Sequence, residues 1–469
     1  MKKENKKLLK NVGALTIGNF ASRFLGLLLI PFYTAVLSTT DYGISDLIVT
    51  TTSLLFPFTS VAISEALMRF ALDKDTDKRS IYTAGISIIT IGYIVLLSAF
   101  PIMQKTPLEP YLIYFYLYYA FYCLHTITSY FVKGLEKIFV FSISGIINTA
   151  IVIVCNLSFL LGFKMGVVGY LLSSIIGHAV TFVFLFFKAE LYKYLTLPHK
   201  IDRKLLKEML KYSVVIIPNS LSWWIANSSD KYILNYFSST SAVGIYSVAY
   251  KIPTIMVTIT GLFISAWHLS AIDDFGSEKS KKFFSETYNK YFSLSVLMAA
   301  FLIVTSKLAA YFLYSNDFFV AYKYTPLLII ACTFDGLASF MGSVYIAAKK
   351  SKMLAISTVL GALSNIILNF ILIPLYEIFG AAIATAISYL IIFIIRIINT
   401  RKILSFNIKY VRDLILLLLL TASCVMTILD TYLTIALSIL LFAVCLVIIV
   451  MEFKDLIKQL LTVRRQKND

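Results

Sequence analysis

Residues 18–48, GNFASRFLGLLLIPFYTAVLSTTDYGISDLI, contain two features that recur along the whole chain. The stretch connects two long apolar segments, 11–38 and 42–70, through a short polar turn. A segment of about 20 apolar residues crosses the ~30 Å hydrocarbon core of a bilayer as an α-helix. The one charged side chain in 11–38 is Arg23, thirteenth of its 28 residues and therefore close to mid-depth. The stretch predicts two membrane-spanning helices, with a cation inside the first.

Composition extends this prediction to the remainder of the chain. Of the 469 residues, 59% are hydrophobic and only 14% are charged, and the mean hydropathy is +0.83. A soluble fold cannot cover that much apolar surface. We predict an all-α polytopic membrane protein with about 14 transmembrane helices, at 11–38, 42–70, 81–103, 111–132, 138–163, 166–187, 212–237, 242–270, 291–314, 324–348, 353–376, 379–399, 410–429 and 432–452.

The net charge of +17 has a topological explanation. If the N-terminus is cytoplasmic, the segments on the inner side hold 32 Lys and Arg residues, whereas the outer loops hold only Lys105, Lys164 and Lys323. Basic residues in short loops stay on the cytoplasmic side, so both termini are expected inside. The clusters can also contact anionic lipid heads, and no nucleic-acid partner is needed to explain them.

Two sets of matches suggest that the chain is a duplication. LSTTDYGIS at 37–45 resembles FSSTSAVGIYS at 237–247 and places Gly43 on Gly244, an offset of 201 residues. Six helices in each half would give the halves parallel topology, an architecture that recurs in transporters and places the substrate site between the repeats. The second set, at an offset of 215, aligns Tyr130, Lys137 and Ser142 with Tyr345, Lys352 and Ser357.

The predicted spans and the duplication together define the domain organisation. We expect a six-helix N-terminal lobe at 1–187 and a basic cytoplasmic connection at 188–211. A six-helix C-terminal lobe should follow at 212–400, and an additional helix pair with a cytoplasmic tail at 401–469.

Three segments resemble one family of carriers. The stretch at 18–48 resembles the first hairpin of oligosaccharide flippases, in the polysaccharide transporter branch of the multidrug/oligosaccharidyl-lipid/polysaccharide exporter superfamily. NSSDKYILNYFSSTSAVGIYSVAYKIPTI at 227–255 resembles their seventh and eighth helices, and FGAAIATAISYLI at 379–391 their twelfth. The resemblance implies two six-helix lobes around a central cavity. It also implies export of undecaprenyl-pyrophosphate-linked repeat units across the bacterial cytoplasmic membrane, for O-antigen, capsule or related polysaccharides, beside other polysaccharide-assembly proteins.

Charges inside the spans are the candidate substrate-binding residues, because an ionisable group near the bilayer centre costs ~2.5–3.5 kcal/mol on insertion scales. The guanidinium of Arg23 suits bidentate binding of phosphate oxygens; a structural pair with a carboxylate is the alternative. Asp335 is either a proton or sodium site or the partner that neutralises Arg23 or a lysine. Asp230, Lys231 and Lys251 would suit an anionic head group in the second half.

The remaining polar residues of the spans are expected to be structural. His125 and His178 lack partners at metal-ligand spacing, and the five cysteines lie in apolar spans without such spacing. Lys307 and Arg396 are expected to snorkel to the membrane surface. We predict no catalytic residue, no metal site and no cofactor; coupling to a proton or sodium gradient is left open.

Three other functions would require residues or loops different from those of a carrier of lipid-linked oligosaccharides. A drug/cation antiporter of the same superfamily should place carboxylates, rather than Arg and Lys, in its cavity. A peptidoglycan-precursor flippase resembles the ASRFLG segment but tends to carry more arginines in the first lobe. A membrane-embedded polysaccharide polymerase needs acid–base groups and usually a sizeable outer loop, whereas all predicted outer loops are under ten residues. We therefore predict a transporter and not an enzyme.

Overall fold

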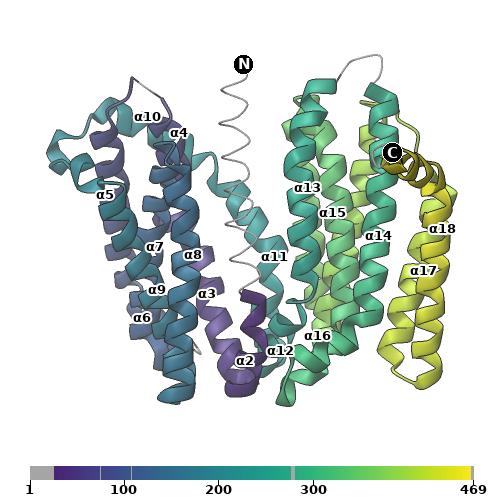
Figure 1. The fold of residues 1–469 in the computed structure, drawn as a ribbon. Helices are drawn as coiled ribbons and strands as arrows, with labels where there is room; N and C mark the ends of the chain where they lie inside the picture. Colours follow the sequence, from purple (N-terminus) through teal and green to yellow (C-terminus); the bar gives the residue numbers. More distant parts are fainter. Residues whose placement is uncertain (1–25, 74, 107, 276–279, 466–469) are drawn as a thin grey trace. The chain divides into compact units, whose positions relative to one another are not determined.

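The computed structural model describes residues 26–73, 75–106, 108–275 and 280–465, which form helices and turns without a strand (Figure 1). Within these ranges nine helices are long and apolar enough to cross a membrane, or ten if one bent pair counts as a single span. The predicted class, an all-helical polytopic membrane protein, is therefore confirmed. Of the first predicted span, the residues up to 25 lie outside the described ranges.

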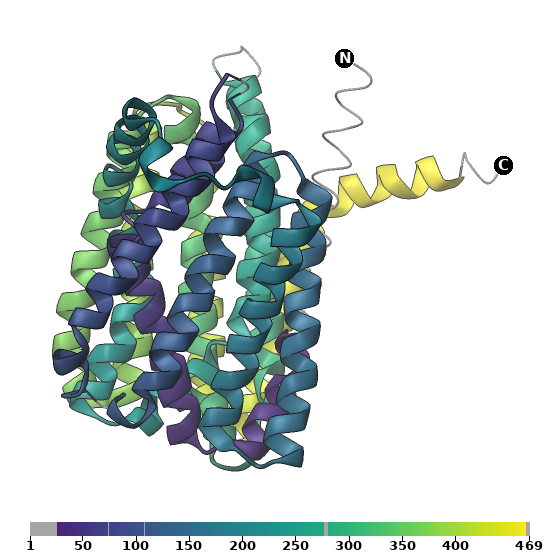
Figure 2. The same cartoon turned by 90° about the vertical axis from the view of Figure 1, so that its left-hand side faces the viewer.

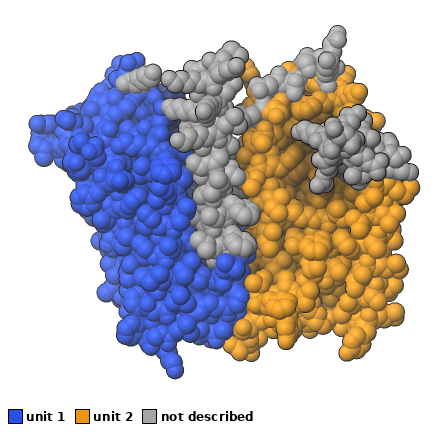
Figure 3. All heavy atoms as spheres, viewed as in Figure 1, with its two compact units in different colours: residues 1–244 blue, residues 245–469 orange. Residues whose placement is uncertain are grey.

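The chain divides into two compact units, residues 1–244 and 245–469 (Figure 3). The division falls at Gly244 and not within 188–211, so the helices that follow this connection pack with the first unit. Each unit has its own buried interior and is described by itself.

Unit 1 is a helical bundle, and most of its long helices run in roughly one direction, as Figure 2 shows. Short 3₁₀ and π-helical turns at Glu109–Tyr111, Leu157–Gly162, Leu191–Tyr194 and Pro198–Lys200 connect them. The α-helices are α2 (Ile30–Val36), α3 (Thr39–Thr59), α4 (Ile63–Ala71), α5 (Lys78–Ser98), α6 (Phe100–Met103), α7 (Leu112–Gly134), α8 (Ile138–Asn156), α9 (Gly166–Lys188), α10 (Arg203–Val214), α11 (Ile217–Phe237) and the first half of α12 (Thr240–Ala249).

The predicted span at 42–70 is broken in the structure. Helices α3 and α4 meet at an angle of 63°, with Val61 and Ala62 in the left-handed region between them. Pro57 lies inside the last turn of α3, just before this break. Hydropathy detects the apolar length on both sides but not this change of direction.

The N-terminal turns of α3 and α12 cross at two glycines. A methyl group added to Gly43 would collide with the carbonyl oxygen of Thr240, and one added to Gly244 would collide with that of Thr39. The hydroxyls of Thr39 and Ser241 are hydrogen-bonded at 2.8 Å across the same crossing. Small residues spaced four apart let helices in membranes approach closely. The two segments matched at an offset of 201 therefore contact each other.

Unit 2 surrounds α15 (Thr325–Ala347), whose most apolar window is 83% buried. α14 begins at Ser280, eleven residues before the predicted span at 291, because an amphipathic segment extends the helix. The helices and turn that complete the unit are α13 (Pro253–Asp274), α14 (Ser280–Leu313), η5 (Asn316–Lys323), α16 (Ser351–Arg401), α17 (Tyr410–Leu429) and α18 (Tyr432–Arg465).

Helix α16 is a hairpin and not one straight rod. Its backbone leaves the helical region at Glu377, where φ is 48° and ψ is −120°. The two arms run antiparallel, because Asn365 lies 3.5 Å from Thr385 and Arg396 lies 3.0 Å from Ser357. The arms correspond to the two predicted spans 353–376 and 379–399.

Candidate functional site

The first group of buried charges lies in unit 1, where α11 packs against α3. Lys231 Nζ lies 2.7 Å from Asp46 Oδ2, and both side chains are only 17% exposed. Lys231 was expected from the sequence to be a substrate-binding cation, whereas Asp46 was not singled out. The pair is separated by 185 residues, so no local spacing could have indicated it. Lys231 is thus partly neutralised by a neighbouring carboxylate.

Two further contacts join the helices that carry this ion pair. The Tyr232 hydroxyl is hydrogen-bonded to Thr51 Oγ1, and Trp224 Nε1 donates to the Thr50 carbonyl at 3.1 Å. Both contacts join α11 to α3, so the charged pair is held on two helices fixed to each other.

Two other residues of the first unit, Asp230 and Arg23, were predicted from the sequence to bind substrate. Asp230 is 2% exposed, and its Oδ1 accepts a hydrogen bond from the backbone N–H of Lys231 at 2.9 Å. Arg23 lies outside the described residues. The structure therefore brings Lys231 to a carboxylate and buries Asp230 beside it on the same helix.

The second group of buried charges lies in unit 2, around Asp335 on α15. Arg396 on α16 is the cation that acts electrostatically on Asp335. Arg396 is 7% exposed. Its guanidinium donates to Ala338 O at 2.8 Å, Ser357 Oγ at 3.0 Å and Thr358 Oγ1 at 2.9 Å. The expectation that Arg396 snorkels is wrong, because the residue is buried and its guanidinium donates hydrogen bonds to acceptors on α15 and α16.

Lys251 and Lys307 lie in separate parts of unit 2. Lys251 is half-buried in the turn between α12 and α13. Lys307 Nζ lies 2.6 Å from Asp430 Oδ1, and the Tyr322 hydroxyl donates to Asp430 Oδ2 at 2.6 Å. Partial burial opposes the charge of Asp430, but hydrogen bonds from Lys307 and Tyr322 outweigh it and hold its pKa below the ordinary value. Lys307 is thus an ion-paired residue and not simply a snorkelling one.

Several asparagines hydrogen-bond to side chains inside the units. Asn369 Nδ2 donates to Asn365 Oδ1 at 3.0 Å, and Asn365 reaches Thr385 on the second arm of α16. In unit 1, Asn156 Nδ2 donates to the Tyr33 hydroxyl at 2.9 Å. Asn156 and Asn365 thus connect separate helix segments, whereas the bond of Asn369 lies within one arm of α16.

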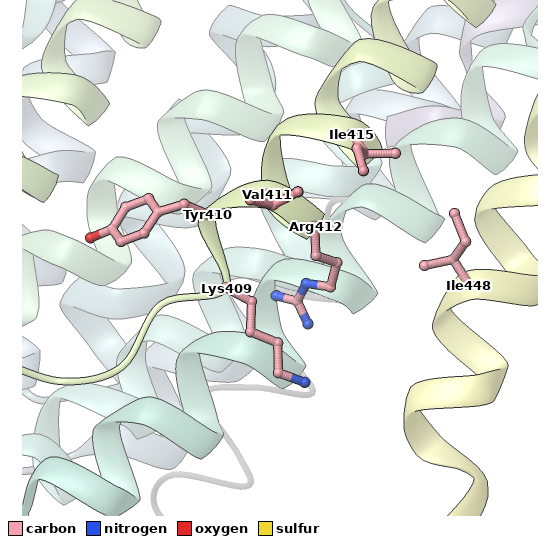
Figure 4. A pocket seen from close by; sticks show the side chains of 6 residues that line it. All are labelled: Lys409, Tyr410, Val411, Arg412, Ile415 and Ile448. Atoms are coloured by element: carbon pink, nitrogen blue, oxygen red, sulfur yellow. The ribbon is translucent and has the colours of Figure 1, made fainter.

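Two cavities in unit 2 combine apolar walls with a basic side chain. One, of about 760 Å³, lies among α13, α14 and α18 and includes Lys290. The other, of about 590 Å³, lies between α17 and α18. Figure 4 shows Lys409 and Arg412 reaching toward the space that Ile448 faces from α18. The first cavity is lined by Ile259, Phe263, Leu294, Met298, Phe301 and Leu446, among others.

A family model described as polysaccharide biosynthesis protein matches residues 8–269, more than half of the chain. The chain belongs to the polysaccharide biosynthesis protein family. This bears out the resemblance inferred from residues 18–48 and 227–255, and no curated protein sequence matches. Among the described residues, no cluster of three or more His, Cys, Asp and Glu side chains could hold a metal ion.

Solved structures similar to this member of the polysaccharide biosynthesis protein family are transporters. The chain is similar to a lipid II flippase, MurJ, in an inward closed conformation, with a TM-score of 0.71 and 18% identity over 94% of this chain and 99% of that one. It is also similar to an outward-facing multidrug resistance MATE transporter of the MOP superfamily, with a TM-score of 0.60 and 15% identity over 85% and 96% of the two chains.

A MOP superfamily transporter from Pyrococcus furiosus has the same fold, with a TM-score of 0.57 and 16% identity over 83% of this chain and 95% of that one. Identities this low show a shared fold alone. Family and fold agree with the prediction of a transporter and not an enzyme.

Proposed function

We propose that this protein is a flippase that moves undecaprenyl-pyrophosphate-linked oligosaccharide repeat units across the cytoplasmic membrane for surface polysaccharide biosynthesis. The observation that carries the proposal is the match to the polysaccharide biosynthesis protein family on a chain whose fold resembles that of a lipid II flippase. A lipid-linked sugar has three parts, and each needs a different environment: a prenyl chain, a pyrophosphate and a sugar head.

The cavity of about 760 Å³ supports this assignment for the prenyl part. Its walls are formed by α13, α14 and α18 and are almost wholly apolar, with Lys290 as the single cation. A hydrocarbon chain bound there would pack against apolar side chains without burying a polar group of its own. The cation would face the charged end of an anionic lipid.

Basic side chains are proposed to bind the pyrophosphate. Arg23, Lys231 and Lys251 are the candidates, with Asp46 holding Lys231 in place until an anion competes for it. Arg23 would contribute the planar fork that grips two phosphate oxygens. Asp230 and Asp335 are proposed to tune the charge of these sites, Asp335 with Arg396 beside it.

The fourteen-span architecture is proposed as the frame for transport. In it, six-helix lobes at 1–187 and 212–400 form a parallel repeat joined by 188–211, and 401–469 adds a helix pair and tail. The glycine crossing supports the repeat, because Gly43 and Gly244 are each other's counterparts in the alignment and contact reciprocally. Rocking of one lobe against the other would expose the substrate to either side.

Reporter fusions should place both the 188–211 connection and the C-terminal tail in the cytoplasm. The reason is the excess of Lys and Arg in these segments, which retains short loops on the inner side. Fusions at 105, 164 and 323, in the predicted outer loops, are the matched controls and should report the outside. An external signal from the connection or the tail would contradict the fourteen-span topology.

Deleting the protein should remove the corresponding surface polymer and leave lipid-linked repeat units on the inner leaflet. The strain should lack a redundant flippase, and the wild-type chain supplied on a plasmid should restore the polymer. Lipid-linked intermediates and surface polysaccharide are measured together. Unchanged polymer with heightened drug sensitivity would instead indicate a drug/cation antiporter.

A peptidoglycan-precursor flippase is the second candidate, favoured by the similarity in fold to the lipid II flippase over 94% of this chain. The same deletion separates the two functions. Lysis with accumulation of peptidoglycan precursor would favour this candidate, whereas intact cells without surface polymer favour the first.

A further inference from the structure

Two histidines, 53 residues apart in the sequence, contact each other inside unit 1. His125 on α7 and His178 on α9 lie with their Nδ1 atoms 2.8 Å apart and their ring centroids 5.1 Å apart. Each side chain is half-buried, so the pair is neither fully enclosed nor freely solvated. The role proposed above for the basic side chains does not use this pair.

A distance of 2.8 Å between two ring nitrogens defines the protonation of the pair. One ring must donate its Nδ1–H and the other must accept, since two bare nitrogens or two N–H groups would repel each other. The donating ring then has a bare Nε2. A proton added there forms one N–H bond and makes that ring an imidazolium, whose hydrogen bond to the second ring becomes charge-assisted and stronger.

The same geometry limits the pair to one extra proton. A second proton would have to occupy the accepting Nδ1, which would break the hydrogen bond and place two positive rings 5.1 Å apart. The two rings therefore titrate as one site whose charge changes from 0 to +1.

Two tyrosine rings lie beside the pair. Tyr118 and Tyr122 of α7 make T-shaped contacts with His178, with ring centroids at 5.4 and 5.6 Å. Among the described residues, no Asp, Glu, Lys or Arg acts electrostatically on either histidine. The acidic residues of α3 and α4, which pack against α7 or α9, interact elsewhere: Asp41 with Ser38, Asp46 with Lys231 and Glu65 with Tyr130. Within the described ranges, a proton at this site therefore has no fixed counter-ion and can leave again.

A metal ion between the rings is a poorer explanation. Two imidazole nitrogens on one tetrahedral zinc, each at ~2.0–2.1 Å, would lie roughly 3.3 Å apart, well beyond the observed 2.8 Å. No third carboxylate, thiolate or imidazole joins them to make a metal site among the described residues.

We propose that the His125–His178 pair is a one-proton binding site that couples transport to the proton gradient. The proposal rests on the proposed function, because coupling requires that the protein transports a substrate. Histidine chains in membrane spans serve as proton relays in transporters. Coupling follows if the conformations of the transport cycle differ in how readily the pair binds its proton.

The proton site is tested without transport. The chain contains only four histidines, so protein labelled with ¹⁵N-histidine and reconstituted in lipid nanodiscs should give imidazole signals that substitutions assign. We expect a coupling across the Nδ1–H···Nδ1 bond and uptake of one proton by the pair as the pH is lowered from 9 to 3. His199→Gln, at an exposed position, is the matched control and should leave both signals unchanged. Two rings that titrate independently, or not at all, would overturn the proposal.

The coupling is tested in proteoliposomes that carry an undecaprenyl-pyrophosphate-linked oligosaccharide. For one proton per cycle, a gradient of one pH unit should change the distribution of the lipid between leaflets about tenfold. His125→Gln and His178→Gln should lose this response, whereas His199→Gln should keep it. A full response in both single variants would remove the coupling role. If the wild-type protein does not flip this lipid, the proposed function is contradicted instead. The titration still decides whether the pair binds a proton.

Discussion

Replacing Gly43 with alanine is expected to destabilise the protein and abolish transport. In an open helix interior the same change stabilises by roughly 0.5–1 kcal/mol. At Gly43 the added methyl would collide with the backbone carbonyl of Thr240 and lie 3.1 Å from the Gly244 nitrogen. Backbone atoms cannot move aside as a side chain can, and overpacking of this kind costs ~1–3 kcal/mol or more. Thermal stability in detergent and flipping in proteoliposomes should both fall.

The matched control is Gly261→Ala on α13, where an added methyl meets no atom within 4 Å. It should be neutral or slightly stabilising. Gly244→Ala, on the other side of the crossing, should reproduce the loss seen at Gly43, because its methyl meets the Thr39 carbonyl. If Gly43→Ala behaves like Gly261→Ala, the close crossing of α3 and α12 does not exist in the protein.

Replacing Arg396 with leucine is expected to have the second large effect. The guanidinium donates three hydrogen bonds to buried acceptors on α15 and α16 and is the cation beside Asp335. Removing the guanidinium leaves these acceptors without their donor, and hydrogen bonds to a charged group contribute ~1.5–3 kcal/mol each. Protein abundance and thermal stability should therefore drop sharply. Arg396→Lys should recover only part of this, since one ammonium cannot reproduce the planar fork.

Arg401→Leu is the control on the same helix, at an exposed position, and should change stability by less than ~1 kcal/mol. The double variant Arg396→Leu/Asp335→Asn distinguishes two roles for Asp335. If the carboxylate only balances the guanidinium, abundance and transport return together. If it also binds an ion during transport, abundance returns and transport does not. Equal stability of Arg396→Leu and Arg401→Leu would refute the buried arrangement.

The helices could be predicted from the sequence because apolar length and hydrophobic composition are local properties. The turn between the first two spans carries a local signal as well: Ser38 and Asp41 form a capping box that starts α3. The break at Glu377, between the two arms of α16, falls between two predicted spans, because the apolar length on each side is enough for one span. The start of α14 was missed, since its first turns are polar on one face and lower the mean hydropathy.

The partners of the charges could not be predicted in this way. Asp46 with Lys231 and His125 with His178 come from helices distant in the sequence, and only packing decides which faces meet. Arg396 was misjudged because its position near a predicted helix end suggested an exit to the surface. Its acceptors include Ala338 O and Thr358 Oγ1. They lie on neighbouring helix segments, and a hydropathy profile does not indicate which segments are neighbours.

The reciprocal contact at Gly43 and Gly244 has the form of an isologous interface within one polypeptide. Thr39 opposes Gly244 while Thr240 opposes Gly43, the pattern that two identical subunits produce about a twofold axis. In a half-length ancestor that formed a homodimer, both sides of this contact would have been the same glycine, encoded once in the gene. Once fused, the two positions became free to diverge, yet the steric requirement at each still depends on the other. Sequences related to this chain should therefore keep both glycines or change them together.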